Sequence, residues 1–321
     1  MKKELIVQVM IPFCTSKCVY CAEPVLGYST GLSKRYTDAL LRQIEELKED
    51  VADYEISAIS LEGGCPTLLE PGNLQTVIRA LRKSFPLKED VQISLQTMPG
   101  DYSRALMDRM RDNGVNFYIV GLQTTNPAEH ELLSRPYRFD ALSMVDVAIR
   151  TFPMRKLSFD VLLGIPGQTW ETLEHTLDVA LAYQPDHLSL MPFRVERRTP
   201  FFASVIGGEI QKMGKEQMEE LRLRAEEKLK SCGYKPYTRE DYCLPGGENL
   251  FRLGFMQGSE QLGLGFRSFT AMDGVMYWTG EHIEEYLRFA GNMSVLAKSV
   301  WEIEGAGAEF LEKVRKRMLP R

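Results

Sequence analysis

The 321-residue chain lacks the features that mark several protein classes. No apolar run approaches the roughly 18 residues that a membrane helix needs, and the apolar stretch from Leu5 to Phe13 is interrupted by Gln8. Basic residues do not exceed acidic ones, and the formal net charge of -5 gives no overall attraction toward nucleic acid. We therefore expect a soluble, cytoplasmic protein with no membrane segment and no evident nucleic-acid partner.

Cysteine is also scarce, with six residues in the whole chain. A secreted disulfide scaffold would carry a denser set. Three of the six nevertheless lie together, as Cys14, Cys18 and Cys21, while the others are scattered. In a reducing compartment such a cluster indicates a metal or redox site rather than disulfide bridges.

Short runs rich in β-branched residues alternate with longer amphipathic segments over the first 190 residues. The predicted strands are 5–10, 56–61, 91–96, 117–121, 157–163 and 187–191. The predicted helices are 34–48, 74–83, 102–113, 139–150 and 169–183. Strands that alternate with crossover helices predict a parallel α/β sheet, but both an open doubly wound sheet and a barrel are built in this way.

The alternation of strand-like and helical segments ends after Pro192. Residues 193–213 contain three arginines, Thr199-Pro200 and a glycine pair, and this composition predicts a linker. A charged helix is expected over 215–230, and further helices over 281–289 and 294–318. The predicted division is therefore a first domain over 1–192, a linker over 193–213 and a smaller α+β domain over 214–321.

The clustered cysteines follow the first predicted strand directly. Parallel α/β folds place their active sites in the loops at the carboxyl ends of strands. Three thiolates hold three irons of a 4Fe-4S cube and leave the fourth iron open to a chelating molecule. A structural zinc site is the alternative, but zinc takes four ligands and no histidine lies near this loop.

The pattern C-x3-C-x2-C, with Tyr20 before the last cysteine, resembles the signature of the radical S-adenosylmethionine (SAM) superfamily. Other segments resemble its oxygen-independent coproporphyrinogen III oxidase and heme-chaperone (HemN/HemW-like) group, namely Ile11 to Cys14, Gly63 to Leu69, Gly121 to Thr124, Asp160 to Thr169 and Leu262 to Gly265. The resemblance spans about residues 5 to 290. It implies a partial, open (β/α)6 TIM-like barrel whose mouth is closed by the smaller C-terminal α+β domain.

The resemblance also implies a chemistry. A 4Fe-4S cluster on Cys14, Cys18 and Cys21 would reductively cleave SAM to a 5'-deoxyadenosyl radical, which abstracts hydrogen from a small organic substrate. It implies one or two SAM molecules and an electron donor such as flavodoxin or ferredoxin. The enzyme class, oxidoreductase or methyltransferase, stays open, because hydrogen abstraction, radical methyl transfer and carbon-carbon bond formation all fit.

The SAM contacts that the resemblance implies are Tyr20, Gly63, Gly64, Cys65, Pro66, Thr67, Gln96, Gln123, Arg135 and Asp160. The glycines would let backbone carbonyls approach the ammonium of SAM, and Arg135 would contact its carboxylate. Simpler explanations exist: a strand-end turn for the glycine pair, a small buried residue at Cys65, a helix cap at Asp160 and a surface ion pair at Arg135.

Several positions depart from the pattern of the porphyrin-active members. Gln8 and Met10 replace Tyr and His, Gln96 replaces Glu, Glu62 and Cys65 replace Gly and Thr, and Glu23 replaces a further Cys. The His-Asn-x-x-Tyr-Trp pattern of the heme chaperones aligns with Phe251 to Met256, which removes an axial ligand for heme iron. We expect a pocket rebuilt for a smaller substrate, with Arg194, Arg197 and Arg198 as candidate contacts for a carboxylate or phosphate. Three alternatives remain, namely a heme-binding or trafficking protein, a porphyrin enzyme on the same fold, and a zinc-dependent binding module.

Overall fold

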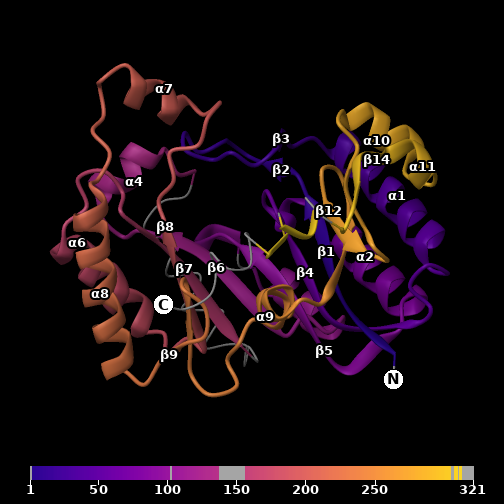
Figure 1. Cartoon of the computed structure of the whole chain (residues 1–321), viewed down its shortest axis with the longest axis horizontal. Coiled ribbons are helices and arrows are strands. Elements are labelled where there is room, and N and C mark those ends of the chain that lie inside the picture. The colour runs from indigo at the N-terminus through magenta and orange to yellow at the C-terminus, as the bar shows by residue number, and fades with distance from the viewer. Residues whose placement is uncertain (1, 102, 137–155, 305–306, 310, 313–321) are drawn as a thin grey trace.

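A single large sheet runs through the molecule (Figure 1). The structure is a computed structural model that describes residues 2–101, 103–136, 156–304, 307–309 and 311–312. Within this part of the chain the sheet has twelve strands in the order β14-β13-β12-β11-β1-β4-β5-β6-β7-β8-β10-β9. The sheet does not close on itself, so the expected partial, open α/β barrel is confirmed.

Six strands in the middle of the sheet run parallel. They are β1 (Lys3–Ile11), β4 (Tyr54–Gly63), β5 (Leu87–Thr97), β6 (Phe117–Gln123), β7 (Leu157–Leu163) and β8 (His187–Pro192). Each predicted strand is therefore present. The largest difference is in β5, which begins at Leu87 rather than at Val91.

Helices connect these strands. They are α1 (Thr30–Leu47), α2 (Pro71–Ser84), α3 (Arg104–Asp112), the short α4 (Pro127–Leu133) and α6 (Trp170–Leu181). α1 begins four residues earlier than predicted because the hydroxyl of Ser29 accepts a hydrogen bond from the amide of Leu32, 3.3 Å away, and caps the helix. The helix predicted over 139–150 lies outside the described residues.

The two faces of the parallel sheet differ in character. On the outer face, alternate aliphatic side chains such as Ile93, Val161 and Leu188 pack against the helices in one hydrophobic core. On the inner face the alternate positions are largely polar, among them Ser60, Ser94, Ser158, Asp160 and Ser189. A parallel sheet with a polar inner face encloses a site rather than a packed core.

The C-terminal segment extends this sheet at both edges. β9 (Lys235–Pro236) and β10 (Asp241–Cys243) follow β8, while β11 (Glu260–Leu264) pairs in parallel with β1. Beyond β11 come the antiparallel strands β12 (Phe269–Met272), β13 (Val275–Thr279) and β14 (Ala297–Glu302). The division into domains stays a prediction, and its later segment shares the sheet of the first.

Between β10 and β11 lies α9 (Leu250–Gln257), which packs Phe251 and Phe255 against Ile6 of β1 and Ala58 of β4. These two positions lie in the first halves of their strands, and the amide of Leu250 donates to the side chain of Gln92 on β5, so α9 covers the amino-terminal side of the partial barrel. In Figure 1 this orange helix crosses below the central strands. The inner cavity therefore has a floor, and its mouth lies at the carboxyl ends of the strands.

The remaining helices confirm some expectations and correct others. α8 (Lys215–Ser231) and α10 (Ile283–Phe289) lie where helices were predicted, and the predicted linker contains α7 (Pro200–Ile206). The helix predicted over 294–318 is wrong in its first part. After the short α11 (Met293–Leu296) the chain forms β14, because residues 297–302 find backbone partners on β13.

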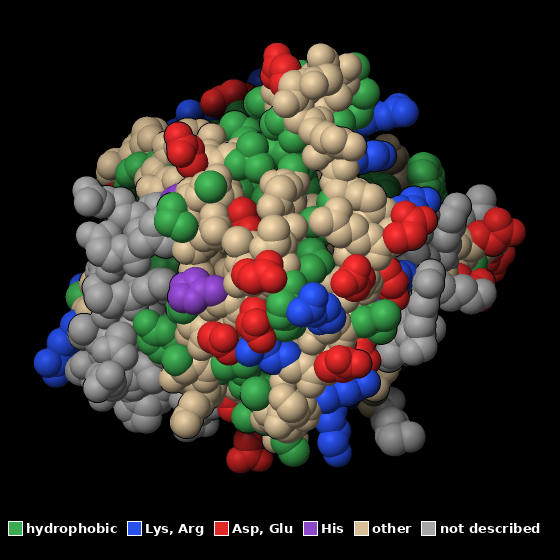
Figure 2. All heavy atoms as spheres, turned by 90° about the vertical axis from the view of Figure 1, so that its left-hand side faces the viewer, with side chains coloured by type: hydrophobic (Ala, Val, Ile, Leu, Met, Phe, Trp, Pro, Cys, Tyr) green, Lys and Arg blue, Asp and Glu red, His purple; other side chains and the backbone are tan. Residues whose placement is uncertain are grey.

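On the face that carries α6 and α8, acidic and basic side chains intermix (Figure 2). Many are paired, as Arg222 is with Glu226 and Lys228 with Glu174. The described residues of this face therefore form no patch of one sign for a polyanion. Across the described residues, no helix combines the length and apolar character that crossing a membrane requires.

Candidate active site

The inner face of the sheet encloses a cavity of about 820 Å³. It extends from the loop that carries the three clustered cysteines down to α9, and strands β1 and β4 through β8 contribute to its walls. The volume lies in the range typical of small-molecule sites, about 300–1,000 Å³. The cavity is therefore the candidate active site.

Cys14, Cys18 and Cys21 line the mouth of this cavity. Cys14 ends the short strand β2 (Phe13–Cys14), which pairs with β3 (Leu26–Gly27) and fixes the start of the loop. Burial, followed by the neighbouring thiols Cys21 and Cys18, raises the pKa of Cys14 to about 11. The three thiols are thus close enough to affect one another. In the described part of the chain, no three Cys, His, Asp or Glu side chains converge as the ligands of a bound metal ion would.

Arg135 links the cysteine loop to β6. Its guanidinium donates to the carbonyl of Gly121 at 2.5 Å and to the hydroxyl of Tyr20 at 3.3 Å, and it lies 3.8 Å from Sγ of Cys18. This residue is partly buried at the cavity wall. It places a cation beside the thiols, where it favours an anionic ligand.

The glycine pair at the end of β4 is explained first by close packing. A Cβ atom on Gly64 would lie 2.5 Å from the carbonyl oxygen of Phe13, and Gly63 has a φ of +111°. The amides of Gly64 and Cys65 donate to Ile11 and Phe13 at 2.8 and 2.7 Å, so this turn is joined to the cysteine loop. Both glycines also line the cavity.

Cys65 lies in the cavity wall, 98% buried, with its Sγ atom 3.2 Å from Asp101 and 3.0 Å from Thr67. Burial and the Asp101 carboxylate raise the pKa of its thiol. It is therefore a thiol rather than a thiolate. Pro66 and Thr67 follow in a short 3-10 turn and are not among the described residues that line the cavity.

Gln96 and Gln123 reach the cavity from the ends of β5 and β6. Gln123 has an unusual backbone, with a φ of +66° that non-glycine residues seldom adopt. Its side chain is 95% buried, and no hydrogen-bond partner for its Oε1 atom exists within the described residues. A strained residue that holds an unsatisfied buried acceptor at a cavity is typical of a ligand contact.

Asp160 lies deeper, on the inner face of β7. Burial raises the pKa of its carboxyl to about 6, although the nearby Arg252 lowers it. Asp160 is not a helix cap, because it lies within a strand. A ligand that donates hydrogen bonds to this carboxylate would offset the cost of its burial.

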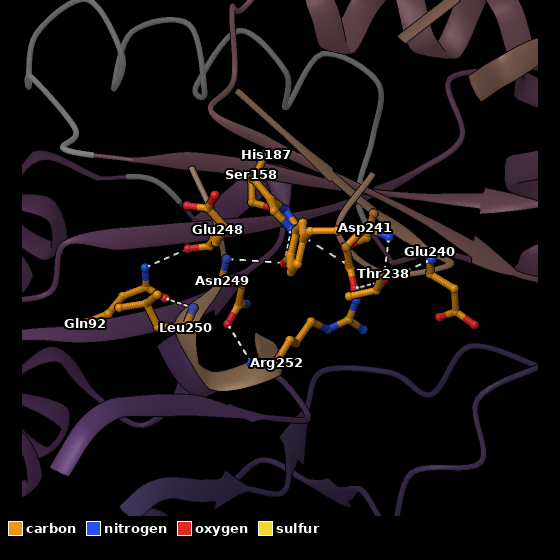
Figure 3. A network of polar contacts seen from close by, with 12 residues as sticks. Gln92, Ser158, His187, Thr238, Glu240, Asp241, Glu248, Asn249, Leu250 and Arg252 are labelled. Atoms are coloured by element: carbon orange, nitrogen blue, oxygen red, sulfur yellow. Dashed lines mark hydrogen bonds and ion pairs between the residues drawn. The ribbon is translucent and has the colours of Figure 1, made fainter. Parts of the chain in front are cut away.

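The floor of the cavity is a network of polar side chains (Figure 3). Arg252 extends from α9 toward the carboxylate of Asp241 on β10 and forms an ion pair with it. Asp241 also accepts from Ser189 and Thr238, each at 2.6 Å. Burial alone would raise the pKa of Asp241, but Arg252, His187 and these hydroxyls together hold it below its usual value. The pair is therefore ionised and fixed in place.

Beside this pair, His187 joins two hydroxyl groups. Its Nδ1 atom lies 2.7 Å from Oγ of Ser158, and its Nε2 atom lies 2.8 Å from the hydroxyl of Tyr237. Burial lowers the pKa of His187 to about 4, and the smaller opposing effect of Asp241 does not reverse this. The imidazole is neutral at physiological pH.

The structure thus brings most of the predicted site residues to one cavity. All of the predicted residues except Pro66 and Thr67 line it. The sequence patterns described above did not point to five further polar residues of the cavity and its floor, namely Arg252, Asp241, His187, Ser158 and Ser189. A signal existed in β7 and β8, where serine, aspartate or histidine alternates with apolar residues in strands that parallel sheets usually bury on both faces.

Comparisons with known proteins bear on this site. A family model described as the Radical SAM superfamily matches residues 9–180. The chain is 24% identical over 256 residues to a protein named heme chaperone HemW from Buchnera aphidicola subsp. Schizaphis graminum, covering 79% of this chain and 67% of that protein. It is 27% identical over 249 residues to oxygen-independent coproporphyrinogen III oxidase from Pseudomonas aeruginosa, covering 75% and 53%. The chain spans about half to two thirds of the length of these relatives.

Among solved structures, coproporphyrinogen III oxidase (HemN) from Escherichia coli is similar, with a TM-score of 0.78 at 21% identity. The similarity covers 94% of this chain and 71% of that one. At this identity the comparison shows the fold, and it agrees with the open sheet described above. The resemblance to the HemN/HemW-like group is confirmed by these comparisons.

Proposed function

The chain belongs to the radical SAM superfamily, and from that premise we propose that it is an enzyme that modifies a small organic substrate by hydrogen abstraction. The family implies a 4Fe-4S cluster and SAM. When bound, these would supply a 5'-deoxyadenosyl radical by one-electron cleavage of SAM, with the electron coming from a donor such as flavodoxin or ferredoxin. Radical methyl transfer and carbon-carbon bond formation are the other outcomes of the same chemistry.

One observation carries the proposal. The cysteine triad, the Arg135 cation and the side-chain carbonyl oxygen of Gln123, which has no partner among the described residues, all line one cavity although they come from three different segments. Three thiol donors in one loop suit iron and sulfide, and their number leaves one iron of a cube without a protein ligand. We propose Cys14, Cys18 and Cys21 as the cluster ligands.

The other residues would hold SAM. Arg135, held by Gly121 and Tyr20, would bind its carboxylate. Gln96, Gln123 and Asp160 would hydrogen-bond its polar groups, while Gly63, Gly64 and Cys65 would form the adjoining wall. Pro66 and Thr67 would act indirectly, by holding the turn and the thiol of Cys65. The depth of the cavity below these residues leaves room for a substrate or for a second SAM molecule.

The test is anaerobic reconstitution with iron and sulfide, followed by reduction with dithionite in the presence of SAM. We expect about four irons and four sulfides per chain and the release of 5'-deoxyadenosine. Formation of S-adenosylhomocysteine would indicate methyl transfer. Protein that binds zinc but neither iron nor sulfide would contradict the proposal and support a zinc module instead.

A heme-binding or porphyrin enzyme is the second candidate, because the curated relatives carry such names. The floor of the cavity disfavours it. Phe251 packs there against Ile6 and Ala58, and both ring nitrogens of His187 have hydrogen-bond partners. Among the described cavity-lining residues, His187 is the one histidine. Titration with heme tests this candidate: a spectrum with an axial histidine ligand, or decarboxylation of coproporphyrinogen III, would overturn our preference.

A further inference from the structure

The direction of the hydrogen bonds on the cavity floor follows from the number of hydrogens available. The hydroxyl of Tyr237 accepts from the amide of Asn249 at 3.2 Å and has one hydrogen to donate. Among the described residues, its one acceptor is Nε2 of His187. A neutral imidazole that accepts at Nε2 carries its hydrogen on Nδ1, so it donates to Oγ of Ser158. The opposite arrangement would leave the half-buried Tyr237 hydroxyl without an acceptor among the described residues.

Ser158 is therefore a donor to the cavity. Its oxygen is occupied by the hydrogen from His187, and the residue is 99% buried and lines the cavity. Its own hydrogen has no other described acceptor. The chain of bonds from Asn249 through Tyr237 and His187 thus orients one hydroxyl donor toward whatever occupies the floor.

Arg252 supplies further donors nearby. Its Nη1 atom donates to Asp241 and, at 3.2 Å, to Ser189, while Nε and Nη2 donate to no described residue. Its side chain is 28% exposed and lines the cavity, so this exposed surface faces the ligand space. Ser158 and Asp160 alternate along β7 opposite His187 and Ser189 on β8, which puts both sets of donors on one patch of the floor.

The charge of this patch determines whether a charged or an uncharged ligand group binds to its donors. The ionised Asp241 already neutralises Arg252, and the carboxyls of Asp160 and Glu240 also lie close enough to interact with the guanidinium. A carboxylate that entered here would meet these acids, whereas an uncharged carbonyl oxygen accepts hydrogen bonds without adding a charge.

We propose that the cavity floor binds an uncharged carbonyl oxygen of the substrate, through the hydroxyl of Ser158 and the N–H groups of Arg252. The substrate class is then a small carboxamide, lactam or ketone rather than a free carboxylic acid. Phe251 and Phe255, which line the same end of the cavity, provide the apolar surface beside it. This inference rests on the proposed function and narrows its substrate.

A matched pair of probes tests the charge preference. 3-Phenylpropanamide and 3-phenylpropanoate have nearly the same size and differ in charge. Their dissociation constants are measured by anaerobic calorimetry at pH 7.5 on the reconstituted protein. We expect the amide to bind at least 5-fold more tightly. Equal or tighter binding of the carboxylate would overturn the inference, and so would the absence of binding by both probes at millimolar concentrations.

Two variants test the assigned residues. Ser158→Ala should weaken amide binding about 5-fold, since one neutral hydrogen bond is lost, while Ser94→Ala should leave it unchanged. Ser94 is matched, because it is buried on the same inner face but bonds to Ser60 and does not line the cavity. Asp160→Asn should shrink the preference for the amide at least 3-fold, since one nearby negative charge disappears. An unchanged preference in a folded Asp160→Asn protein would contradict the charge argument.

Failure of this inference is distinguishable from failure of the proposed function. Cluster content and release of 5'-deoxyadenosine are measured without either probe on the same preparations. If the cluster forms and SAM is cleaved but the carboxylate binds best, the substrate assignment alone is wrong. If no cluster forms, the proposed function is wrong whatever the probes show.

Discussion

The mouth and the floor of the cavity are assembled in opposite ways. At the mouth, three cysteines lie in one loop directly after β1, and the turn after β4 is joined to that loop by backbone hydrogen bonds. At the floor, Ser158, His187, Asp241 and Arg252 come from four separate elements and meet only in the folded protein. A site for a metal cluster can be encoded in a short stretch of chain, whereas a site that recognises one substrate is assembled from many segments.

The largest effect is expected at the mouth. Cys18→Ala should remove the cluster and reduce SAM cleavage to background, because a thiolate ligand is lost. Iron and sulfide analysis and the yield of 5'-deoxyadenosine measure this. Cys232→Ala is the matched control, since Cys232 is exposed at the end of α8, and should change neither. Full cluster content in Cys18→Ala would show that the mouth is not the cluster site.

The next effect concerns the stability of the floor. Asp241→Asn should lower the free energy of unfolding by about 3 kcal/mol, because it leaves the guanidinium of Arg252 without its buried counter-ion. Denaturant unfolding measures the change. Glu284→Gln, which breaks the exposed pair with Arg35, is the control and should have an effect of about 0–1 kcal/mol. Similar losses in both variants would contradict the special role of the floor.

Because of Asp160, the stability of the folded protein should depend on pH. Its folded pKa of about 6 lies above that of an unfolded aspartate, so the unfolded chain loses the proton first as the pH rises from 4 to 6. The wild-type protein therefore loses stability over this range, and Asp160→Asn does not incur this loss. The stability of the variant relative to wild type should rise by about 2 kcal/mol between pH 4 and pH 7.

Unfolding midpoints of both proteins, measured in parallel across this range, show whether the relative stability of the variant rises with pH as expected. Because both proteins retain His187, its own titration largely cancels in the difference. If the stability of the variant relative to wild type stays constant, or falls as the pH rises, Asp160 is not held in a desolvated environment.

The smallest effect is expected for one hydrogen bond near the mouth. Gln123→Ala should weaken SAM binding about 5-fold, equivalent to about 1 kcal/mol, because a neutral side-chain bond is lost. Equilibrium dialysis on the reconstituted protein measures this. Gln184→Ala is a matched control, since Gln184 also has a positive φ, of +50°, but is exposed and outside the cavity. Equal affinities in both variants would remove Gln123 from the SAM site.

The parallel strands and the cysteine loop could be predicted from the residues alone. Strand runs such as Leu157–Leu163 carry a period-two pattern that is local, and the cysteine spacing lies within one loop. The family's motifs also pointed to Gln123, Arg135 and Asp160, all of which reach the cavity. Helix ends were predicted less closely, because a single cap such as Ser29 can move a boundary by a full turn.

The remaining features depend on contacts that form only in the folded protein. β14 forms in place of a helix because β13 offers it backbone partners, and α9 closes the barrel because Phe251 fits against β1 and β4. Arg252 looks like a surface residue in the sequence, and its role exists only once β10 places Asp241 beside it. Such contacts join residues that are distant in the chain, and their free energy depends on burial and on the geometry of several partners at once.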